Sequence, residues 1–416
     1  MQAVAPRDQI PGHAGDYREV GVDDLPGIDE ALDQVLSRVQ PLAAEAVPVA
    51  AAAGRVLAQD ARAVVDLPPF ASSAMDGYAV RASDTPGRLP VGGQSAAGSP
   101  LGRPQDAGEA IVISTGAVVP EGADAVVPVE VTERDGDVVR VEAVNAGAHV
   151  RPRGGDARSG ETIGCAGQLL GPTQVGALAA VGLASVVCAR RPRVAVLATG
   201  SELRAPGETL GPGEIYESNT ALIAAQVRSA GGEPVVLAPV ADDAEATREA
   251  LARGLESDVL ITSGGVSVGP HDLVRRALQE LGAAEVFWRV AVKPGKPIAF
   301  ATRGTTLVFG LPGNPVSSLV GFELFVRPAL LALQGATRPQ PAFLPGRAAV
   351  DLPRNDARDE LVRARVRVEP EGVVLEPVTG QDSHMIARAF PADALVLVPR
   401  GDGAVPAGAP VSYLSL

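Results

Sequence analysis

The sequence D-V-L-I-T-S-G-G-V-S-V-G-P-H-D, residues Asp258 to Asp272, is the most informative part of the chain about its fold. Its apolar and β-branched start, Val259–Thr262, is typical of a short strand that is buried on both faces of a parallel sheet. Glycines then let the backbone turn and approach a ligand, and a helical pattern begins after Asp272. The stretch therefore predicts a strand, a ligand loop and a helix start. A plain Gly-rich connector with Asp272 as the N-cap is the alternative.

The predicted ligand loop offers two kinds of polar group. Ser263 and Ser267 carry hydroxyls, and the backbone at Gly264 and Gly265 can present amides to an anion. We therefore count these four residues as substrate-binding candidates.

Length and charge restrict the class of protein. A chain of 416 residues is too long for one core, and 46% hydrophobic residues are enough to bury several. The 49 acids exceed the 36 bases, which gives a formal charge of −13. Because nucleic-acid binding needs a broad basic surface, we expect no nucleic-acid partner.

The sequence also indicates a compartment. No stretch reaches the roughly 18 uninterrupted apolar residues of a membrane span, and the first residues lack the apolar core of a signal peptide. We expect a cytoplasmic protein without membrane insertion. Cys165 and Cys188 are the only cysteines, and we expect both to be reduced and buried.

Two helical segments frame a β-rich region in the first half of the chain. Apolar residues on one face predict a helix over Ile28–Gln40, and a second is expected over Thr173–Val181, capped by Thr173. We therefore expect a discontinuous N-terminal helical domain, residues 1–61 and 148–191.

The region between these segments, residues 62–147, is predicted to be an inserted β domain. Strands are expected at Ala110–Ser114 and Ala125–Val129, and a hairpin should turn at Asp135-Gly136-Asp137.

Residues 192–336 alternate strand and helix patterns, which indicates an α/β domain with a parallel sheet and helices on both faces. Its expected elements are Val194–Ala198, Ser218–Ala230, Val235–Pro239, Asp242–Leu255, the stretch quoted above, a strand near Val286–Val292, and Thr306–Gly310. Asp242 and Glu245 have capping-box spacing. Pro315 opens a long apolar helix that Pro328 should kink or end.

Residues 337–416 return to short strands separated by turns. These strands are expected at Leu361–Val368, Val373–Val378, Ala394–Val398 and Val411–Leu414. They predict a small C-terminal β barrel or sandwich.

Four strand exits of the α/β region carry polar or charged residues. Because parallel strands end at one edge, these exits should bring Glu202, Asp242, Asp272, Lys293 and Lys296 around one crevice. Carboxylates beside lysines suit a phosphorylated ligand with a hard divalent cation. Neither a Walker A motif nor G-x-G-x-x-G is present, which excludes the ordinary NTPase and dinucleotide-binding classes.

The inserted region and the segment just after it carry further candidates, each with a plain alternative. Asp76-Gly77 presents a carboxylate beside a glycine, although a hairpin turn would look the same. Thr115 follows a strand much as Ser263 does. Arg151, Arg153 and Asp156 could hold an anion and a cation, or form a solvated loop.

Taken together, the motifs closely resemble the MoeA family of molybdopterin molybdenumtransferases, which includes the gephyrin E domain. The resemblance covers nearly the whole chain. It rests on S-A-M-D-G-Y-A, S-T-G-A with P-E-G-A-D-A, R-x-R-G-x-D, T-G-S-E-L, G-E-I-Y-E-S-N, S-G-G-V-S-V-G, K-P-G-K-P and G-L-P-G-N-P, in family order.

The resemblance implies a fold and a reaction. The implied fold is the domain order above, with residues 192–336 as a molybdopterin-binding domain, in an elongated homodimer. The implied reaction takes adenylylated molybdopterin and molybdate, and yields molybdenum cofactor and AMP, with Mg²⁺ as the cation. Implied partners are a molybdopterin adenylyltransferase or a peptide.

The family's functional positions carry over onto this chain residue by residue. We expect catalytic roles for Asp76, Glu202, Asp242 and Asp272, and metal binding by Glu202, Asp272 and Asp156. The substrate-binding positions implied are Thr115, Arg151, Lys293, Lys296, Pro312 and Pro315.

Two departures from the family pattern stand out. Arg289 replaces the lysine that usually follows the Phe-Trp pair. Pro270-His271 replaces a pair that usually begins with an acid, so His271 is either a metal ligand or a solvent-facing imidazole.

Two other functions remain open at this point. A gephyrin-like scaffold could keep the fold, bind peptides of membrane or cytoskeletal proteins at the dimer and lose catalysis. A molybdopterin adenylyltransferase would share the α/β domain but lack the insert and the C-terminal domain.

Overall fold

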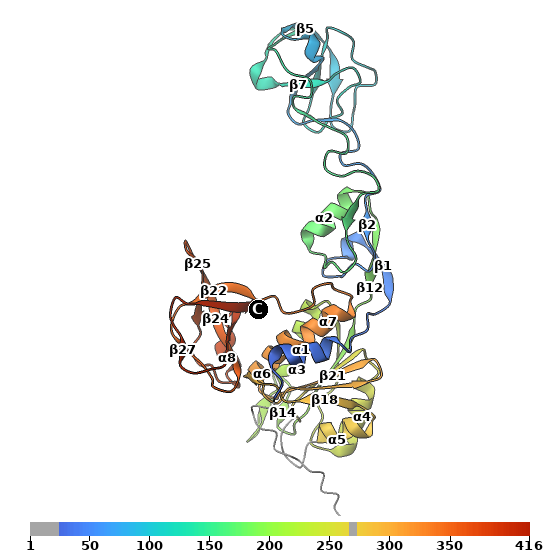
Figure 1. Ribbon diagram of the computed structural model, residues 1–416. Helices are drawn as coiled ribbons and strands as arrows, with labels where there is room; N and C mark the ends of the chain where they lie inside the picture. Colours follow the sequence, from blue (N-terminus) through green and yellow to red (C-terminus); the bar gives the residue numbers. More distant parts are fainter. Residues whose placement is uncertain (1–24, 266–272) are drawn as a thin grey trace, which may run out of the picture.

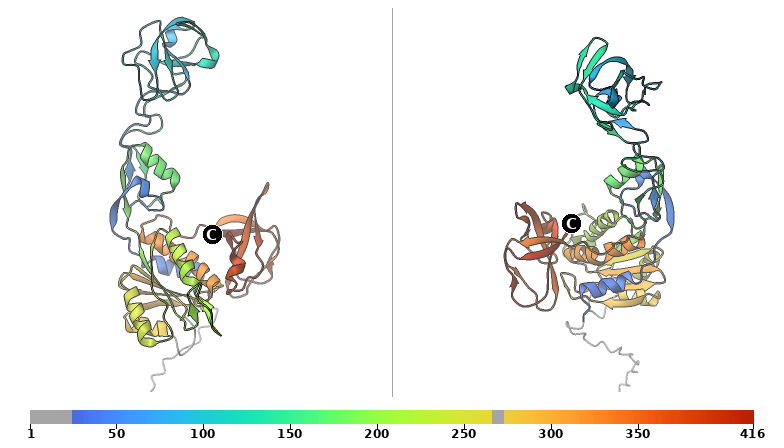
Figure 2. Two further views of the ribbon diagram at one scale, coloured as in Figure 1. Left: turned by 180° about the vertical axis from the view of Figure 1, so that it is seen from behind. Right: turned by 45° about the horizontal axis from the view of Figure 1, so that its top comes forward.

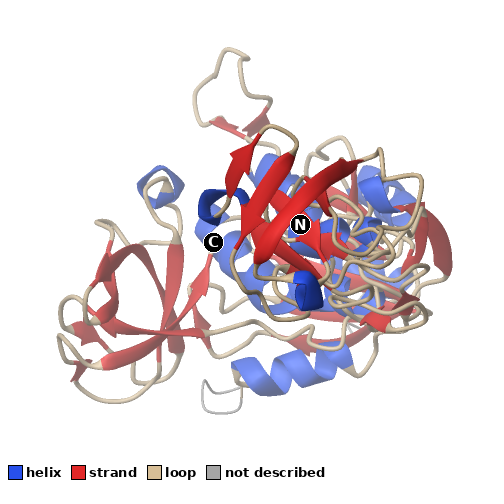
Figure 3. Cartoon of the chain, turned by 90° about the horizontal axis from the view of Figure 1, so that it is seen from above, coloured by secondary structure: helices blue, strands red, loops and turns tan. Residues whose placement is uncertain are grey.

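The computed structural model describes residues 25–265 and 273–416. The molecule is elongated: the inserted β domain forms one end, the α/β domain forms the other, and a small unit connects them (Figures 1 and 2). Seen along the long axis, the C-terminal barrel lies to one side of the α/β domain (Figure 3).

The α/β domain is built on a six-stranded sheet in the order β16-β13-β17-β21-β20-β18. Its strands are β13 (Arg193–Ala198), β16 (Glu233–Val236), β17 (Val259–Ser263), β18 (Ala284–Trp288), β20 (Ala299–Arg303) and β21 (Thr306–Leu311). The first four strands of that order are parallel, as predicted. The sheet is nevertheless mixed, because β20 forms an antiparallel hairpin with β21 that the sequence pattern did not indicate.

Helices cover both faces of this sheet, as predicted. One face packs against α4 (Ala244–Gly254) and α5 (Leu273–Glu280). The other packs against α3 (Asn219–Ser229), the helical segment after Pro315, and α1 (Ile28–Leu36). α1 was expected in the N-terminal domain, but its apolar stripe is buried in the core of the α/β domain.

The helical segment after Pro315 consists of α6 (Pro315–Gly321), a π-helical turn (Phe322–Val326) and α7 (Arg327–Leu333). Pro328 lacks an N–H for the helix ladder, and the wider turn before it lets the helix continue instead of ending. The segment has the length and composition of a membrane span, but 83% of it is buried in this core.

The inserted domain is all-β, and its predicted strands and hairpin are confirmed. Its sheet runs β7-β4-β6-β5-β9-β8. The strands are β4 (Gly77–Val80), β5 (Gly87–Ser95), β6 (Ala110–Ile113), β7 (Ala125–Pro128), β8 (Glu133–Asp135) and β9 (Val138–Val141), with β3 (Ser72–Ser73) and β10 (Val150–Arg151) pairing beside them.

The connecting unit joins segments from both sides of the insertion. Its elements are β1 (Ala44–Pro48), β2 (Ala61–Arg62), β11 (Thr162–Gly164), α2 (Pro172–Ala180) and β12 (Ser185–Ala189). α2 begins one residue earlier than predicted, with Gly171 and not Thr173 at the N-cap, because Pro172 suits the first helical position. Cys188 is buried here as predicted, but Cys165 is exposed because it lies in a surface turn.

The C-terminal domain is a closed barrel. Its strands are β22 (Leu344–Ala348), β24 (Asp359–Glu369), β25 (Gly372–Pro377), β26 (Ala394–Val398) and β28 (Pro410–Ser415). β24 pairs with both β25 and β26, which closes the barrel and confirms the prediction. A two-residue strand of the α/β domain, β19 (Val292–Lys293), adds to the edge of β24.

Candidate functional site

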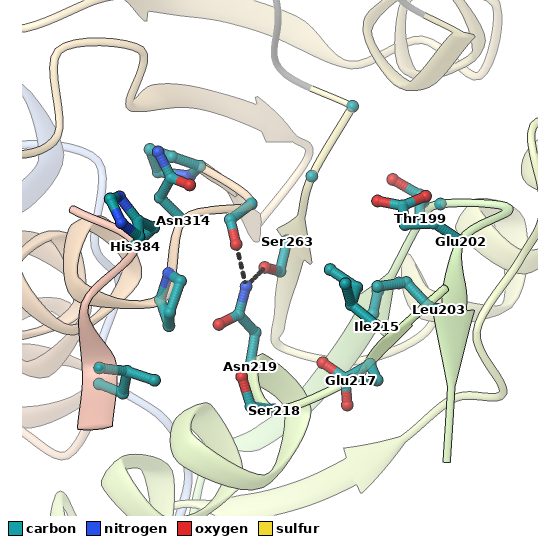
Figure 4. A pocket seen from close by; sticks show the side chains of 18 of the residues that line it. Thr199, Glu202, Leu203, Ile215, Glu217, Ser218, Asn219, Ser263, Asn314 and His384 are labelled. Carbon is teal, nitrogen blue, oxygen red and sulfur yellow. Dashed lines mark hydrogen bonds between the residues drawn. The ribbon is translucent and has the colours of Figure 1, made fainter. Parts of the chain in front are cut away.

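A pocket of about 1000 Å³ lies at the carboxyl ends of β13, β17 and β21. Its walls come from the predicted strand exits, from the start of α3 and from a loop of the C-terminal barrel (Figure 4). The predicted residues that line it are Glu202, Asp242, Ser263, Gly264, Gly265, Lys296, Pro312 and Pro315. The sheet topology therefore brings together, at the carboxyl ends of its strands, residues that span 114 positions of the chain, from Glu202 to Pro315.

Asn219, which sequence reasoning missed, connects two of these exits. Its Nδ2 donates to Ser263 Oγ and to the Gly313 carbonyl, at 2.7 Å each. Because a carbonyl can only accept, this bond fixes the orientation of the amide. Its Oδ1 is buried and has no partner among the described residues. The S-N pair that opens α3 was a signal, because Asn at a helix start beside a ligand loop is available for binding.

Three described acids line the pocket, and their surroundings differ. The Glu217 carboxylate accepts from the Thr220 N–H at 2.8 Å, at the start of α3. Asp242 exchanges hydrogen bonds with Ser201: its Oδ2 accepts the hydroxyl at 3.0 Å, and its N–H donates to Oγ at 3.0 Å. The N-cap of α4 is not Asp242 but Asp243, whose Oδ1 accepts from Ala246 N at 2.8 Å. Because Asp243 takes the capping role, the Asp242 carboxylate lies in the pocket wall.

Glu202 curls over a glycine that has no side chain. A Cβ at Gly200 would lie 2.5 Å from Glu202 Oε2, so a side chain there would push the Glu202 carboxylate aside. Figure 4 shows Glu202 beside Thr199 at one side of the pocket, across from His384.

The sequence predicts two lysines, Lys293 and Lys296, at the pocket, but Arg289 lines it in place of Lys293. Lys296 and Arg289 both line it. Lys293 does not: β19 carries it to the barrel edge, where its Nζ lies 3.2 Å from the Glu360 carboxylate. Lys293 therefore bridges two domains in this chain.

The glycines of the predicted loop leave little spare room. Gly264 and Gly265 have φ values of +91° and +65°, and a Cβ would lie 2.7 Å from Thr199 O and 2.5 Å from Val274 Cγ2, respectively. The N–H of Gly264 donates to the Leu311 carbonyl at 3.1 Å, so this amide extends the sheet and is not offered to a ligand. Ser267 and Asp272 lie outside the described residues, as does His271.

A loop of the C-terminal barrel closes another side of the pocket, which the sequence did not reveal. His384 of this loop and Ile386, the first residue of the short helix α8 (Ile386–Ala389), line the pocket. Ser383 accepts from Asn314 Nδ2 at 2.8 Å. Arg363, whose side chain is fully buried, fixes this loop through hydrogen bonds. Its guanidinium donates to the carbonyls of Gly380, Asp382 and Met385.

Burial has an electrostatic consequence for Arg363. It lowers the pKa of the guanidinium below its ordinary value, although nearby Asp382 acts in the opposite direction. Three carbonyl dipoles stabilise the charge, and the charge in return fixes the loop that carries His384.

An apolar wall completes the pocket. Leu203, Ile215 and Tyr216 line it from the short paired strands β14 (Leu203–Arg204) and β15 (Ile215–Tyr216). Ile215 is 53% exposed and Tyr216 46%, so both offer apolar surface to a ligand. An ion pair between Arg204 and Glu214 holds the connecting loop, and the pKa of Glu214 is lowered by the Gly211 N–H and by Arg204.

The predicted residues of the inserted domain and of the segment that follows it are all exposed. Asp76 Oδ1 accepts from Thr115 N at 2.7 Å and from Thr115 Oγ1 at 3.1 Å. Arg151 lies in β10, and Asp156 is exposed in the turn after it. None of these four lines the pocket, which is at the other end of the molecule (Figure 1).

No set of three or more His, Cys, Asp or Glu side chains is positioned to hold a metal ion within residues 25–265 and 273–416. Mg²⁺ needs fewer protein ligands, since it commonly keeps its waters and takes one or two carboxylates together with substrate phosphates. Glu202 and Asp242, which both line the pocket, offer two such carboxylates.

Comparison with known families accounts for most of the chain. The family "MoeA N-terminal region (domain I and II)" matches residues 27–182, "Probable molybdopterin binding domain" matches residues 195–332, and "MoeA C-terminal region (domain IV)" matches residues 345–416.

Curated proteins and solved structures agree with these matches. The chain is 41% identical to molybdopterin molybdenumtransferase 2 of Mycobacterium tuberculosis, over 73% of this chain and 78% of that protein. It is 34% identical to molybdopterin molybdenumtransferase of Haemophilus influenzae, over 92% and 97%. A crystal structure of the molybdopterin biosynthesis moeA protein of Pyrococcus horikoshii superposes with a TM-score of 0.79 at 28% identity, covering 94% of this chain and all of that one.

Proposed function

This chain belongs to the MoeA family of molybdopterin molybdenumtransferases, and from that premise we propose that it inserts molybdate into adenylylated molybdopterin, releasing AMP and forming the molybdenum cofactor. The observation that carries the proposal is the pocket at the carboxyl edge of the α/β sheet. It combines cations, carboxylates and an apolar wall in a volume of about 1000 Å³. Such a combination suits a ligand with a phosphoanhydride and a flat ring system.

Each wall of the pocket has a task in this reaction. Lys296 and Arg289 offset the charge of the phosphates, which grows on the leaving AMP as the anhydride bond breaks. Asn219 offers its free Oδ1 to a hydrogen-bond donor of the substrate. Ile215 and Tyr216 cover one face of a ring.

We propose Mg²⁺ as the cofactor, held by Glu202 and Asp242 together with substrate phosphates. When bound, the ion would neutralise part of the anhydride charge. Asp272 keeps its predicted place in this set on the basis of its position in the sequence alone.

We propose further that the enzyme is a homodimer whose inserted domain completes the partner's pocket. The separation of Asp76, Thr115, Arg151 and Asp156 from the pocket of their own chain supports this assignment. In a C2 dimer each composite site would take these residues from one subunit and Glu202 from the other. Asp156 would then join the metal or phosphate group only across the dimer.

The other functions have less support. An adenylyltransferase would lack the insert and the barrel, and this chain has both. The relatives are named as molybdenumtransferases, which does not favour a scaffold without catalysis. An adenylyltransferase remains the proposed supplier of the substrate. The free cysteines suit the cytoplasm, where we place the protein.

The test is an assay of purified protein for AMP release from adenylylated molybdopterin, with the Haemophilus influenzae relative as positive control. We expect release that requires molybdate, stops with a chelator and resumes with Mg²⁺. Release that ignores molybdate, or none while the control is active, would contradict the proposal.

A further inference from the structure

Arg289 stands in the pocket wall with a backbone conformation that is uncommon for arginine. Its φ is +84°, in the left-handed region that favours glycine. The surrounding chain imposes this conformation, because the N–H of Arg289 donates to the Ile298 carbonyl at 2.9 Å and that of Val290 donates to the Lys296 carbonyl at 3.0 Å. Strain of this kind gathers where a side chain must be presented in one direction.

The indole of Trp288 contacts two guanidinium groups. Arg289 Cζ lies 4.2 Å from the ring centroid and Arg275 Cζ lies 4.5 Å from it. A planar guanidinium can lie along an aromatic ring and keep its N–H edge free, whereas a lysine ammonium has no plane to align. Trp288 can therefore set the orientation of Arg289.

Of the two guanidinium groups at the Trp288 ring, only that of Arg275 is paired with a carboxylate of the described residues. Two guanidinium groups at one indole would repel each other, but Glu285 binds Arg275 through two hydrogen bonds of 2.7 Å. No ion pair involves Arg289 in the part of the chain that the structure describes, so its charge stays available to the pocket. The pair of Arg275 and Glu285 thus adds a second contact to the ring at little cost in repulsion.

The ring of Trp288 makes these contacts without help from its N–H. The indole Nε1 is buried and bonds to no described residue. The side chain borders a small apolar cavity of about 40 Å³ beneath α5. Trp288 therefore acts through its aromatic face, and a phenylalanine ring at this position should keep much of the contact with the guanidinium groups.

We infer that Trp288 and Arg275 are positioning residues. Trp288 holds the guanidinium of Arg289 in a fixed plane at the pocket wall, where it binds a phosphate oxygen of the substrate, and Arg275 acts through its own contact with the Trp288 ring. The inference rests on the proposed function and adds to it a requirement for a flat cation.

The first test compares two neighbouring arginines of α5. Arg276 is 80% exposed and pairs with Glu280, so Arg276→Met is a matched control for Arg275→Met. We expect Arg275→Met to raise the KM for adenylylated molybdopterin about fivefold, the range of one cation–π contact, with a smaller change in kcat. Equal KM values in the two variants would overturn the role of Arg275.

The second test is a double-mutant cycle that separates positioning from plain packing. Trp288→Leu should raise KM about tenfold in the wild-type background, and Trp288→Phe should restore most of the loss. In an Arg289→Lys background the same Trp288→Leu change should have little further effect, because lysine has no plane to lose. An equal effect in both backgrounds would mean that Trp288 only packs.

The third test does not depend on activity. Trp288 is the only tryptophan of the chain, so its emission reports on this contact alone. Titration with AMP as the probe should shift the emission in the wild type but not in Arg289→Met. If AMP shifts the emission of the wild-type protein, but that protein releases no AMP from adenylylated molybdopterin, the proposed reaction is refuted and the inference stands. An unchanged shift in Arg289→Met would refute the inference.

Discussion

Charged residues at the amino ends of the α/β strands form ion pairs within the chain, whereas the described charged residues that line the pocket at the carboxyl ends do not. At the amino edge, Asp258 accepts two hydrogen bonds from Arg190, at 2.6 and 2.7 Å, and one from the Arg193 N–H at 2.8 Å. At the carboxyl edge, Glu202 and Lys296 have no ion pair within residues 25–265 and 273–416. Carboxylates and cations thus pair to complete the fold at the amino ends of the strands and remain available for a ligand at the carboxyl ends.

This difference indicates how a functional charge is recognised. A carboxylate that its own chain has already paired stabilises the fold, and its removal costs free energy of unfolding. A carboxylate without a partner in its own chain can be removed with little change in the free energy of unfolding. Its removal lowers ligand binding or activity instead. Substitutions at the two edges should therefore separate stability from activity.

The largest effect is expected at the carboxyl edge, from Glu202→Gln. Loss of this charge should lower kcat for AMP release by about two to three powers of ten, the range for a single electrostatic group. The melting temperature should stay unchanged. Parallel kinetics and thermal unfolding check both, with the exposed Glu256→Gln as control. A stable variant with wild-type kcat would remove Glu202 from the reaction.

The next effect tests whether the inserted domain extends the same edge across a dimer. Asp76→Ala should lower AMP release by about two powers of ten on its own. After subunit exchange with Glu202→Gln, about a quarter of all sites should recover, because half the dimers are mixed and each mixed dimer has one intact site. Mixed dimers no more active than either parent would place Asp76 in its own chain's chemistry or in the fold.

A third change acts on the barrel loop that borders the pocket. Arg363→Met leaves three carbonyls without their charged donor, which should lower the free energy of unfolding by about 3 kcal/mol. Denaturant unfolding measures the loss, and Arg365→Met, exposed on the same strand, is the control. Equal stability of the two variants would show that solvent replaces the guanidinium.

The smallest effect is expected at the amino edge, from Asp258→Asn. Burial raises the pKa of this carboxyl, but the bonds from Arg190 and Arg193 outweigh burial and leave the pKa below its ordinary value. The ion pair should contribute about 2 kcal/mol at pH 7 with no effect on kcat.

The lowered pKa fixes the pH dependence of that contribution. It is fully present above the unfolded value of 3.8 and is lost as the pH falls through the lower folded value. The stability gap between wild type and Asp258→Asn should therefore be constant from pH 5 to pH 8, and narrow below about pH 4. A gap that widens on acidification would contradict the assignment.

Sequence patterns predicted the parts of the site that follow from one sheet. Parallel strands end at a common edge, so Glu202, Ser263 and Pro312 could be grouped before any coordinates were known. Where two acids were adjacent, as at Asp242 and Asp243, spacing could not decide which one caps the helix and which one lies in the pocket.

Residues supplied from outside that sheet could not be predicted in the same way. His384 reaches the pocket from the barrel, and no periodicity relates a barrel loop to a strand exit 70 residues or more away. Lys293 was grouped with Lys296 because they are neighbours in sequence, yet β19 directs it to Glu360. Contacts between domains depend on how the domains dock, which local patterns do not encode.

The two-residue strand β19 has a consequence for how the molecule can be divided. Its pairing with β24, together with the bond from Asp359 N to the Ala291 carbonyl at 3.1 Å, makes the barrel sheet end inside the α/β domain. A cut between residues 336 and 345 would therefore not release two finished modules. One fragment would keep an unpaired edge and an open pocket, and the other would lack a strand. Modular exchange of barrels between relatives should succeed only when β19 travels with them.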